Sequence, residues 1–347
     1  MADNEFLSKD WYLEFGSLLP PELRELTDHY LQSPDFDSTS QYWKYLGLKN
    51  YKMLIDSGIE NYAQNISRNY FTWVDFNDGQ IQKLASVEFM EDFGFPIFKL
   101  HEGFTAAESI KHNVLIYLTY NYCITSPVLK KKLLETSVES YLSGNSPFIN
   151  YKKFCLTLDL LSSLIEYEIF EPYIDNSYIC EIGGGAGRTT DLILQHHPKT
   201  KVIYADIPPA SFIAYKRFRK FFPEKRIELA YDLSNFLSLI EMSDDWDVLV
   251  CLPSFLDELP AKFFNLTIAI DCFHEFSNSS RQKFIETIDL SSKYMYMKIW
   301  ENTIIPFDNI PLSGRHISGY YIPPHWKIKK SENSIFPSDF MEFVFEI

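Results

Sequence analysis

One stretch, residues 178–194, restricts the fold of this chain more than any other. An apolar run of strand type ends near Glu181, four glycines lie within residues 183–187, and the apolar spacing of a helix follows. Glycines suit such a turn because the backbone must adopt conformations closed to other residues and a ligand must approach the main chain closely. The helix start offers free N–H groups. The stretch therefore predicts a strand, a tight turn and a helix that bind a nucleotide-like ligand.

Two ligand classes compete for this turn, the dinucleotides and S-adenosyl-L-methionine. A dinucleotide turn has the pattern G-x-G-x-x-G or G-x-G-x-x-A, but here the glycines are Gly183, Gly185 and Gly187, and Arg188 follows. A carboxylate at Glu181 can accept hydrogen bonds from the ammonium group of a methionine, whereas it would repel a pyrophosphate. We therefore predict that Glu181 and the three glycines bind S-adenosylmethionine.

A second acidic residue follows the next predicted strand, residues 201–206. This residue, Asp206, stands where a carboxylate can bind both hydroxyls of a ribose. Both ligand classes contain that ribose, so Asp206 predicts a nucleoside without choosing between them. A glycine turn that only caps a helix is the alternative without a ligand, and the two acidic residues disfavour it.

Composition and charge exclude several kinds of partner. The 347 residues, 46% of them apolar, supply a core for one large domain or two ordinary ones. The net charge of -15 disfavours a nucleic-acid groove, which needs clustered cations. The cysteines are scattered singly, without a C-x-x-C pair, and are predicted to be reduced. The acidic start is no signal peptide, and no apolar run reaches the ~20 residues of a membrane span. We therefore expect a cytoplasmic protein.

Residues 1–150 are predicted to form a mostly helical cap that serves substrate binding or dimerisation. Helix starts are recognisable at Pro20, at the capping box of Thr105 and at the cap of Ser126. A further helix is expected over residues 151–170. The aromatic residues between 70 and 100 are interpreted as packing between the cap and the second domain, or as a wall that binds substrate.

Residues 151–347 are predicted to form a Rossmann-like α/β domain, because strands alternate with helices as in a parallel sheet covered on both faces. Two segments, residues 227–231 and 247–253, compete for the third core strand. We assign it to residues 247–253, which places Ser254 and Phe255 beside the adenine. The remaining strands are expected over residues 178–182, 201–206, 265–271 and 293–300, with closing strands in 320–326 and 340–346.

The chain resembles the sugar O-methyltransferases of bacterial glycan and natural-product loci, within the class I S-adenosylmethionine-dependent methyltransferases. The matching stretches are residues 181–188, 206–210, 269–276, 297–300 and 322–326, within about residues 100–347. The resemblance implies a class I methyltransferase sheet, a sugar hydroxyl as acceptor, and a cofactor site that also contains Ile207, Asp271 and Cys272. Asp271, Cys272 and Phe276 differ from the Asn, Ser and Met that the family usually has at these positions.

His274 is the predicted general base, oriented or charge-balanced by Glu275. A sugar hydroxyl is a poor nucleophile unless its proton leaves as the new bond forms, and histidine titrates near neutral pH. His274 follows the predicted strand end at Asp271, where ligands of open parallel sheets bind. One alternative is a loop histidine that caps the next helix. Another is a divalent metal at Asp271, His274 and Glu275, which no second acidic cluster supports.

Further residues and functions stay open. His316 and His325 are reserve candidates for the base, and Lys298 or Arg315 could bind a substrate phosphate. An NAD-dependent oxidoreductase would use the same architecture, and an inactive methyltransferase-like domain would serve only binding or dimerisation. The expected partner is a small hydroxylated molecule, without nucleic acid or membrane, and a homodimer is left open.

Overall fold

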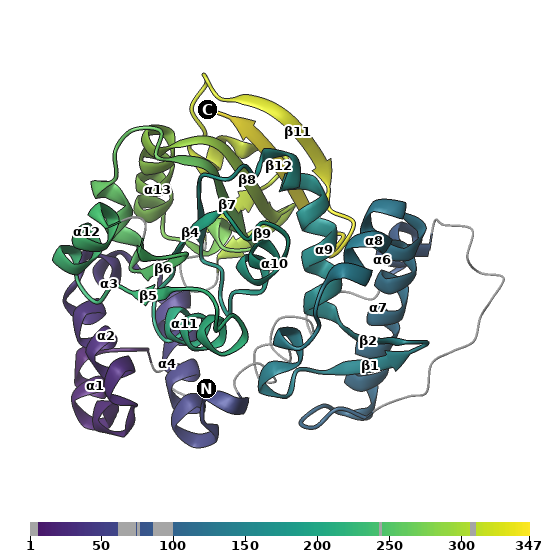
Figure 1. The fold of residues 1–347 in the computed structure, drawn as a ribbon, viewed down its shortest axis with the longest axis horizontal. Helices are drawn as coiled ribbons and strands as arrows, with labels where there is room; N and C mark the ends of the chain where they lie inside the picture. The colour runs from purple at the N-terminus through teal and green to yellow at the C-terminus, as the bar shows by residue number, and fades with distance from the viewer. Residues whose placement is uncertain (1–5, 62–73, 75–76, 86–99, 243–244, 306–309) are drawn as a thin grey trace.

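An eight-stranded sheet forms the centre of the molecule (Figure 1). The computed structural model describes residues 6–61, 74, 77–85, 100–242, 245–305 and 310–347. The strand order is β11-β12-β8-β7-β3-β4-β6-β5. The strands are β3 (Tyr178–Ile182), β4 (Lys201–Ala205), β5 (Ile227–Leu229), β6 (Val248–Cys251), β7 (Phe264–Ile270), β8 (Ser292–Trp300), β11 (Lys327–Asn333) and β12 (Phe340–Glu346). The six neighbouring strands β8, β7, β3, β4, β6 and β5 pair in parallel, whereas β12 is antiparallel to both of its neighbours.

Helices between the parallel strands cover both faces of this sheet. They are α10 (Arg188–His196), α11 (Ala210–Phe221), α12 (Leu233–Glu241) and α13 (Asn278–Ser291). Helix α10 connects β3 to β4 and α11 connects β4 to β5, so both connections lead toward the β5 edge of the sheet. Helix α12 connects β5 to β6 and α13 connects β7 to β8, so these two lead toward the β11 edge. Because such crossovers are right-handed, the two pairs of helices lie on opposite faces. The predicted α/β fold class is therefore confirmed.

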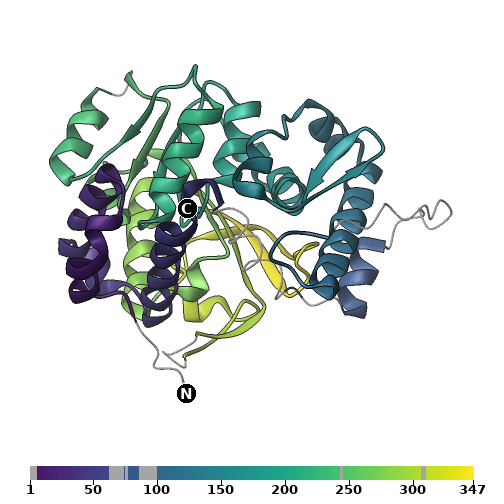
Figure 2. The same ribbon diagram turned by 90° about the horizontal axis from the view of Figure 1, so that it is seen from below.

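The described part of residues 6–157 contains two groups of helices and a short hairpin. Figures 1 and 2 show α1 to α3 on the side of the sheet that carries β5, and α6 to α8 on the opposite side, where α7 and α8 pack against α9. The prediction of a mostly helical segment is thus correct, while one domain boundary at residue 150 stays a prediction. The elements are α1 (Lys9–Phe15), α2 (Pro21–Gln32), α3 (Pro34–Ser38), α4 (Gln41–Ser57), α6 (Asp78–Ala85), α7 (Ala106–Thr125), α8 (Pro127–Glu135), β1 (Phe148–Tyr151), β2 (Phe154–Thr157) and α9 (Leu158–Phe170).

Helix starts follow the sequence signals, with one correction. The capping box at Thr105 is present, since the side chains of Thr105 and Glu108 each accept a hydrogen bond from the other's backbone N–H (3.2 and 2.7 Å). The helix expected over residues 151–170 begins only at Leu158. Residues 148–157 form the β1–β2 hairpin instead, and Thr157 caps α9 by accepting a hydrogen bond from the N–H of Leu160.

The strand assignments are correct except for one segment. Strand β6 pairs with β4 in the third core position as predicted, and β5 adds an edge strand beyond it. Residues 340–346 form β12, but residues 320–326 are not a strand. Tyr321 has a φ of 58° and two prolines follow it, so the ladder starts only at Lys327. A small separate hairpin joins β9 (Asn302–Ile305) to β10 (Ile310–Ser313).

Two expectations concern membranes and aromatic packing. Among the helices that the structure describes, none has both the length and the apolar character to cross a bilayer. The aromatic residues expected between the cap and the sheet lie outside the described residues: Phe71, Trp73, Phe76, Phe89, Phe93, Phe95 and Phe98.

Candidate functional site

The glycine turn joins β3 to α10 as the sequence predicts. Gly183, Gly185 and Gly187 have φ values of 66°, 63° and 83°, which other residues rarely adopt. A Cβ at Gly187 would lie 2.4 Å from the ring of Phe218, and one at Gly183 would lie 2.8 Å from the Cβ of Cys272. The backbone conformation and the close packing therefore both require glycine in this turn.

Asp206 holds the turn against the end of β4. Its Oδ2 accepts a hydrogen bond from the N–H of Gly185 (2.8 Å), and its Oδ1 accepts one from the N–H of Ile207 (2.7 Å). Burial raises the pKa of Asp206 to about 7, although the hydrogen bonds from the two backbone N–H groups favour the ionised form and act in the opposite direction. Because each carboxylate oxygen has a second lone pair, Asp206 can still accept hydrogen bonds from a ligand.

Glu181 is buried at the end of β3 beneath the turn. Its Oε2 accepts hydrogen bonds from the backbone N–H (3.0 Å) and the hydroxyl of Thr190 in the first turn of α10. Burial raises the pKa of Glu181, while the bonds from Thr190 and the charge of Arg188 act in the opposite direction. A cationic ligand group would favour the ionised form of this carboxyl.

Two cavities meet at the glycine turn. The first, the Glu181 cavity, has about 910 Å³ of space with open solvent included, and its lining contains Glu166, Glu181, Arg188, Asp271, Lys298 and Phe340. The second, the Asp206 cavity, has about 590 Å³ on the same measure, and its lining contains Asp35, Trp43, Asp206, Pro253, Cys272 and Phe276. Gly183 and Gly185 line both, so one elongated ligand can reach Glu181 and Asp206 across the turn.

The other predicted cofactor residues divide between these cavities and the core. Ile207 and Cys272 line the Asp206 cavity, and Asp271 lines the Glu181 cavity. Ser254 and Phe255 line neither. Phe255 is buried against Phe236, with 5.6 Å between ring centroids.

Asp271 and His274 form a close pair at the end of β7. Asp271 has a φ of 57°, and its buried Oδ1 lies 3.4 Å from Nε2 of His274 without hydrogen-bond geometry. Burial raises the pKa of Asp271 to about 7 and lowers the pKa of His274 to about 4. His274 packs against the rings of Trp300 and Phe340 and lines neither cavity. Asp271 is therefore the member of the pair that faces the Glu181 cavity.

Neither Glu275 nor the reserve candidates His316, His325 and Arg315 belong to the lining of the two cavities. Oε1 of Glu275 is 3.7 Å from Nε2 of His274, and burial raises the pKa of Glu275 to about 8. His325 pairs with Asp289 at 2.7 Å in an exposed position, and His316 is also exposed. Arg315 is exposed and pairs with Glu301.

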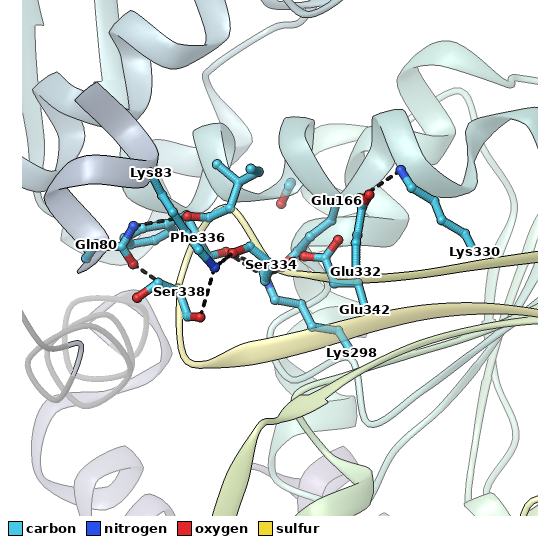
Figure 3. Close-up of polar contacts among 12 residues, drawn as sticks. Gln80, Lys83, Glu166, Lys298, Lys330, Glu332, Ser334, Phe336, Ser338 and Glu342 are labelled. Atoms are coloured by element: carbon cyan, nitrogen blue, oxygen red, sulfur yellow. Dashed lines mark hydrogen bonds and ion pairs between the residues drawn. The ribbon is translucent and has the colours of Figure 1, made fainter. Parts of the chain in front are cut away.

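A network of four charged side chains, three of them buried and the fourth, Arg188, partly exposed, was not predicted from the sequence. Arg188 makes two hydrogen bonds to Glu166 (2.6 and 3.0 Å). Nζ of Lys298 lies 2.7 Å from Glu166 and 3.5 Å from Glu342 (Figure 3). Burial alone would raise the pKa of Glu166, but Arg188 and Lys298 hold it below its usual value. The sequence signal that could have indicated this network is Glu166 itself, a glutamate on the apolar side of the helix predicted over residues 151–170.

Metal binding receives no support from the described part of the chain. No group of three His, Cys, Asp or Glu side chains there could hold a metal ion. That statement covers Asp271, His274 and Glu275, so the alternative of a divalent metal at these residues gains nothing from the structure.

Comparisons with known proteins give only distant similarity. No protein-family model and no curated protein matches the sequence. Among solved structures, a mitomycin 7-O-methyltransferase is 10% identical with a TM-score of 0.36, and the match covers 54% of each chain, about half of that enzyme's length. An S-adenosylmethionine-dependent methyltransferase from Clostridium acetobutylicum is 11% identical with a TM-score of 0.36, covering 54% of this chain and 90% of that one.

A third solved structure, fibrillarin from Aeropyrum pernix with bound S-adenosylmethionine, is 12% identical with a TM-score of 0.37, covering 62% of this chain and 86% of that one. Similarity at this level does not assign a function to the chain. The functional argument therefore rests on the chain's own cavities and side chains.

Proposed function

We propose that the protein is an S-adenosylmethionine-dependent O-methyltransferase of small hydroxylated molecules. The observation that carries the proposal is the pair of cavities that meet at Gly183 and Gly185, one containing Asp206 and the other Glu181. A nucleoside in the Asp206 cavity would offer its ribose hydroxyls to Asp206. An amino-acid group joined to that nucleoside would cross the turn and present its ammonium to Glu181.

The charges around the turn fit this cofactor better than a dinucleotide. Burial raises the pKa of Glu181, Asp206 and Asp271, so each of these carboxyl groups would gain from a nearby cation. S-adenosylmethionine carries an ammonium and a sulfonium and supplies the methyl group. NAD would place a pyrophosphate beside the same carboxyl groups. The alternative of an NAD-dependent oxidoreductase is thus disfavoured on electrostatic grounds.

The acceptor is proposed to be a sugar or a molecule that contains one. The Glu181 cavity offers hydroxyl and carboxylate groups that can bind several hydroxyls at once. These groups belong to Ser140, Ser143, Ser146, Asp159 and Ser162. The resemblance to sugar O-methyltransferases points to the same class of acceptor. We propose no nucleic-acid or membrane partner, and the homodimer stays open.

The proton of the attacking hydroxyl is proposed to go to the Asp271–His274 pair. In the transfer, the acceptor oxygen forms a bond to the methyl carbon, the carbon–sulfur bond breaks, and the hydroxyl proton must leave. Asp271 faces the cavity with a pKa of about 7, which suits a general base near neutral pH. His274, the base predicted from the sequence, has its Nε2 atom 3.4 Å from Oδ1 of Asp271 and would orient that carboxyl, since its pKa of about 4 makes it the weaker proton acceptor of the two.

Calorimetry and labelling test the proposal. The protein should bind S-adenosylmethionine and S-adenosylhomocysteine, and it should transfer a labelled methyl group to members of a panel of glycosides and nucleotide sugars. Binding of NAD without binding of either adenosyl compound would refute the cofactor assignment. Labelling of RNA alone would refute the acceptor class, and binding without labelling of any compound would favour an inactive binding module.

A further inference from the structure

The Asp206 cavity is built from two distant parts of the chain. One wall is the glycine turn with the ends of β4 and β6. The opposite wall comes from the first helices, since residues of α3, of α4 and of the link between them line the same cavity: Asp35, Ser38, Thr39, Ser40 and Trp43. The segment from residue 35 to residue 43 therefore closes a cavity whose other wall is the proposed cofactor site.

Hydrogen bonds fix this segment to the carboxyl end of the sheet. Ser254, which follows β6, donates to Oδ2 of Asp35 from its backbone N–H (3.2 Å) and from its hydroxyl (2.7 Å). The hydroxyls of Ser277 and Ser280, at the start of α13, donate to the carbonyl of Ser38 (3.0 and 2.8 Å). Helix α3 is thus hydrogen-bonded to two segments that follow the carboxyl ends of parallel strands, where ligands of such sheets bind.

Only one of the two carboxylate oxygens of Asp35 accepts hydrogen bonds from the described residues. The side chain is buried, with 8% relative exposure, and burial raises its pKa against the two bonds from Ser254. Both of those bonds go to Oδ2, and no residue of the described chain donates a hydrogen bond to Oδ1. A buried carboxylate oxygen that lines a cavity is stabilised by a donor from a ligand.

The position of Asp35 relative to Asp206 indicates which part of a ligand it meets. Asp206 and Ser254 follow neighbouring strands, since Ala205 of β4 pairs with Cys251 of β6. With the ribose at Asp206, the attached base would extend past the carboxyl end of β6 toward Pro253 and Asp35. Apolar side chains that can enclose a flat ring line the same cavity: Pro253, Phe276 and Phe284.

We infer that Asp35 accepts a hydrogen bond from the 6-amino group of adenine and that the first helices complete the nucleoside half of the cofactor site. The inference rests on the proposed function, because it takes the ligand to be an adenosyl compound. A purine with an oxygen at position 6 would place an acceptor against the carboxylate. The site should therefore select a 6-aminopurine nucleoside over its 6-oxo counterpart.

The test compares S-adenosylhomocysteine with S-inosylhomocysteine, which has an oxygen in place of the 6-amino group and a hydrogen on the neighbouring N1 atom. The unaltered protein should bind the adenosyl compound roughly 10- to 100-fold more tightly, the usual effect of a hydrogen bond to a charged group. Asp35→Ala should reduce this preference to within a few-fold. Asp35→Asn should reduce or reverse it, because the amide can still accept from Ser254 while its NH₂ group donates toward the purine.

Asp37→Ala is the matched control, since Asp37 lies exposed on the same short helix and should keep the full preference. If Asp35→Ala fails to fold, Asp35→Asn decides. A preference that survives in the Asp35 variants would overturn the inference while the proposed function stands. Failure of the unaltered protein to bind either compound would overturn the proposed function itself.

Discussion

Asp206 and Asp271 have pKa values of about 7 because burial disfavours their charged forms. Glu181, between them in the site, is shifted upward for the same reason. Above their pKa values these buried acids carry charges that the ligand-free protein leaves poorly solvated, and a ligand that supplies positive charge would offset this cost. This protonation state makes ligand binding sensitive to pH near neutrality.

The ratio of affinities for S-adenosylmethionine and S-adenosylhomocysteine should therefore depend on pH. The two compounds share an ammonium, but only the first has a sulfonium, which prefers an ionised Asp271. Lowering the pH from 8 to 6 protonates this carboxyl and should weaken binding of S-adenosylmethionine relative to S-adenosylhomocysteine by roughly tenfold. Calorimetry at constant ionic strength measures the ratio. Asp271→Asn should remove its pH dependence, and a flat ratio in the unaltered protein would contradict the assignment.

Substitutions in the Asp271–His274 pair should reduce turnover while S-adenosylhomocysteine still binds. Asp271→Asn and His274→Ala are each expected to lower turnover by ~10²- to 10⁴-fold, the usual contribution of a positioned base. Because the two residues act on one proton, the double variant should be little worse than the more severe single variant. Asp37→Asn, an exposed change, serves as the control. If His274→Ala stays within a few-fold of the parent, His274 has no part in the base.

At the scale of elements, the buried charges join helices α9 and α10 to strands β8 and β12. Glu166 of α9 pairs with Arg188 of α10 and with Lys298 of β8. Lys298 also approaches Glu342 of β12 (Figure 3). All four charges depend on one another, because a buried charge without its partner is strongly destabilising.

Glu166→Gln should therefore destabilise the ligand-free protein by about 3 kcal/mol or more, since it leaves Arg188 and Lys298 with one carboxylate fewer. Urea denaturation gives the free energy of unfolding. Glu135→Gln makes the same substitution in an exposed pair with Lys131 and should cost less than about 0.5 kcal/mol. A loss below about 1 kcal/mol for Glu166→Gln would show that the network is not essential to folding.

Elements with local causes could be predicted from the sequence. The glycine turn and the cap at Thr105 depend on backbone geometry within a few residues, and the buried strands on their own apolar runs. The β1–β2 hairpin was missed because each strand has only four residues, too few for an alternating pattern. The burial of His274 was missed because Trp300 and Phe340 reach it from distant strands. Asp35 gave no signal, because its partner lies far along the chain.

For the whole molecule, the raised pKa values set the pH dependence of stability. A carboxyl whose folded pKa exceeds its unfolded value stabilises the protein at low pH, and this contribution is lost as the pH rises through the folded pKa. Asp206 and Asp271 titrate at about 7 and Glu275 at about 8. The buried histidines, with lowered pKa values, act mainly below pH 7.

The ligand-free protein should therefore lose on the order of 1 kcal/mol of unfolding free energy between pH 7.5 and pH 8.5. Urea denaturation at the two pH values measures the change. The same experiment with Glu275→Gln should show a smaller loss, because the group that titrates most strongly in this interval is then absent. Equal or greater stability at pH 8.5 in the unaltered protein would contradict the pKa assignments.

The contact between α3 and the loop after β6 also bears on synthesis at the ribosome. Asp35 and Ser254 are 219 residues apart, and Lys83 donates to the carbonyl of Ser334 across 251 residues. At ~5–20 residues per second, the nascent chain grows for about 10 to 40 s between the appearance of Asp35 and that of Ser254. During that interval α3 lacks the hydrogen bonds that Ser254 donates to Asp35. The Asp206 cavity, whose lining extends from Asp35 to Phe284, can therefore form only after most of the chain has been synthesised.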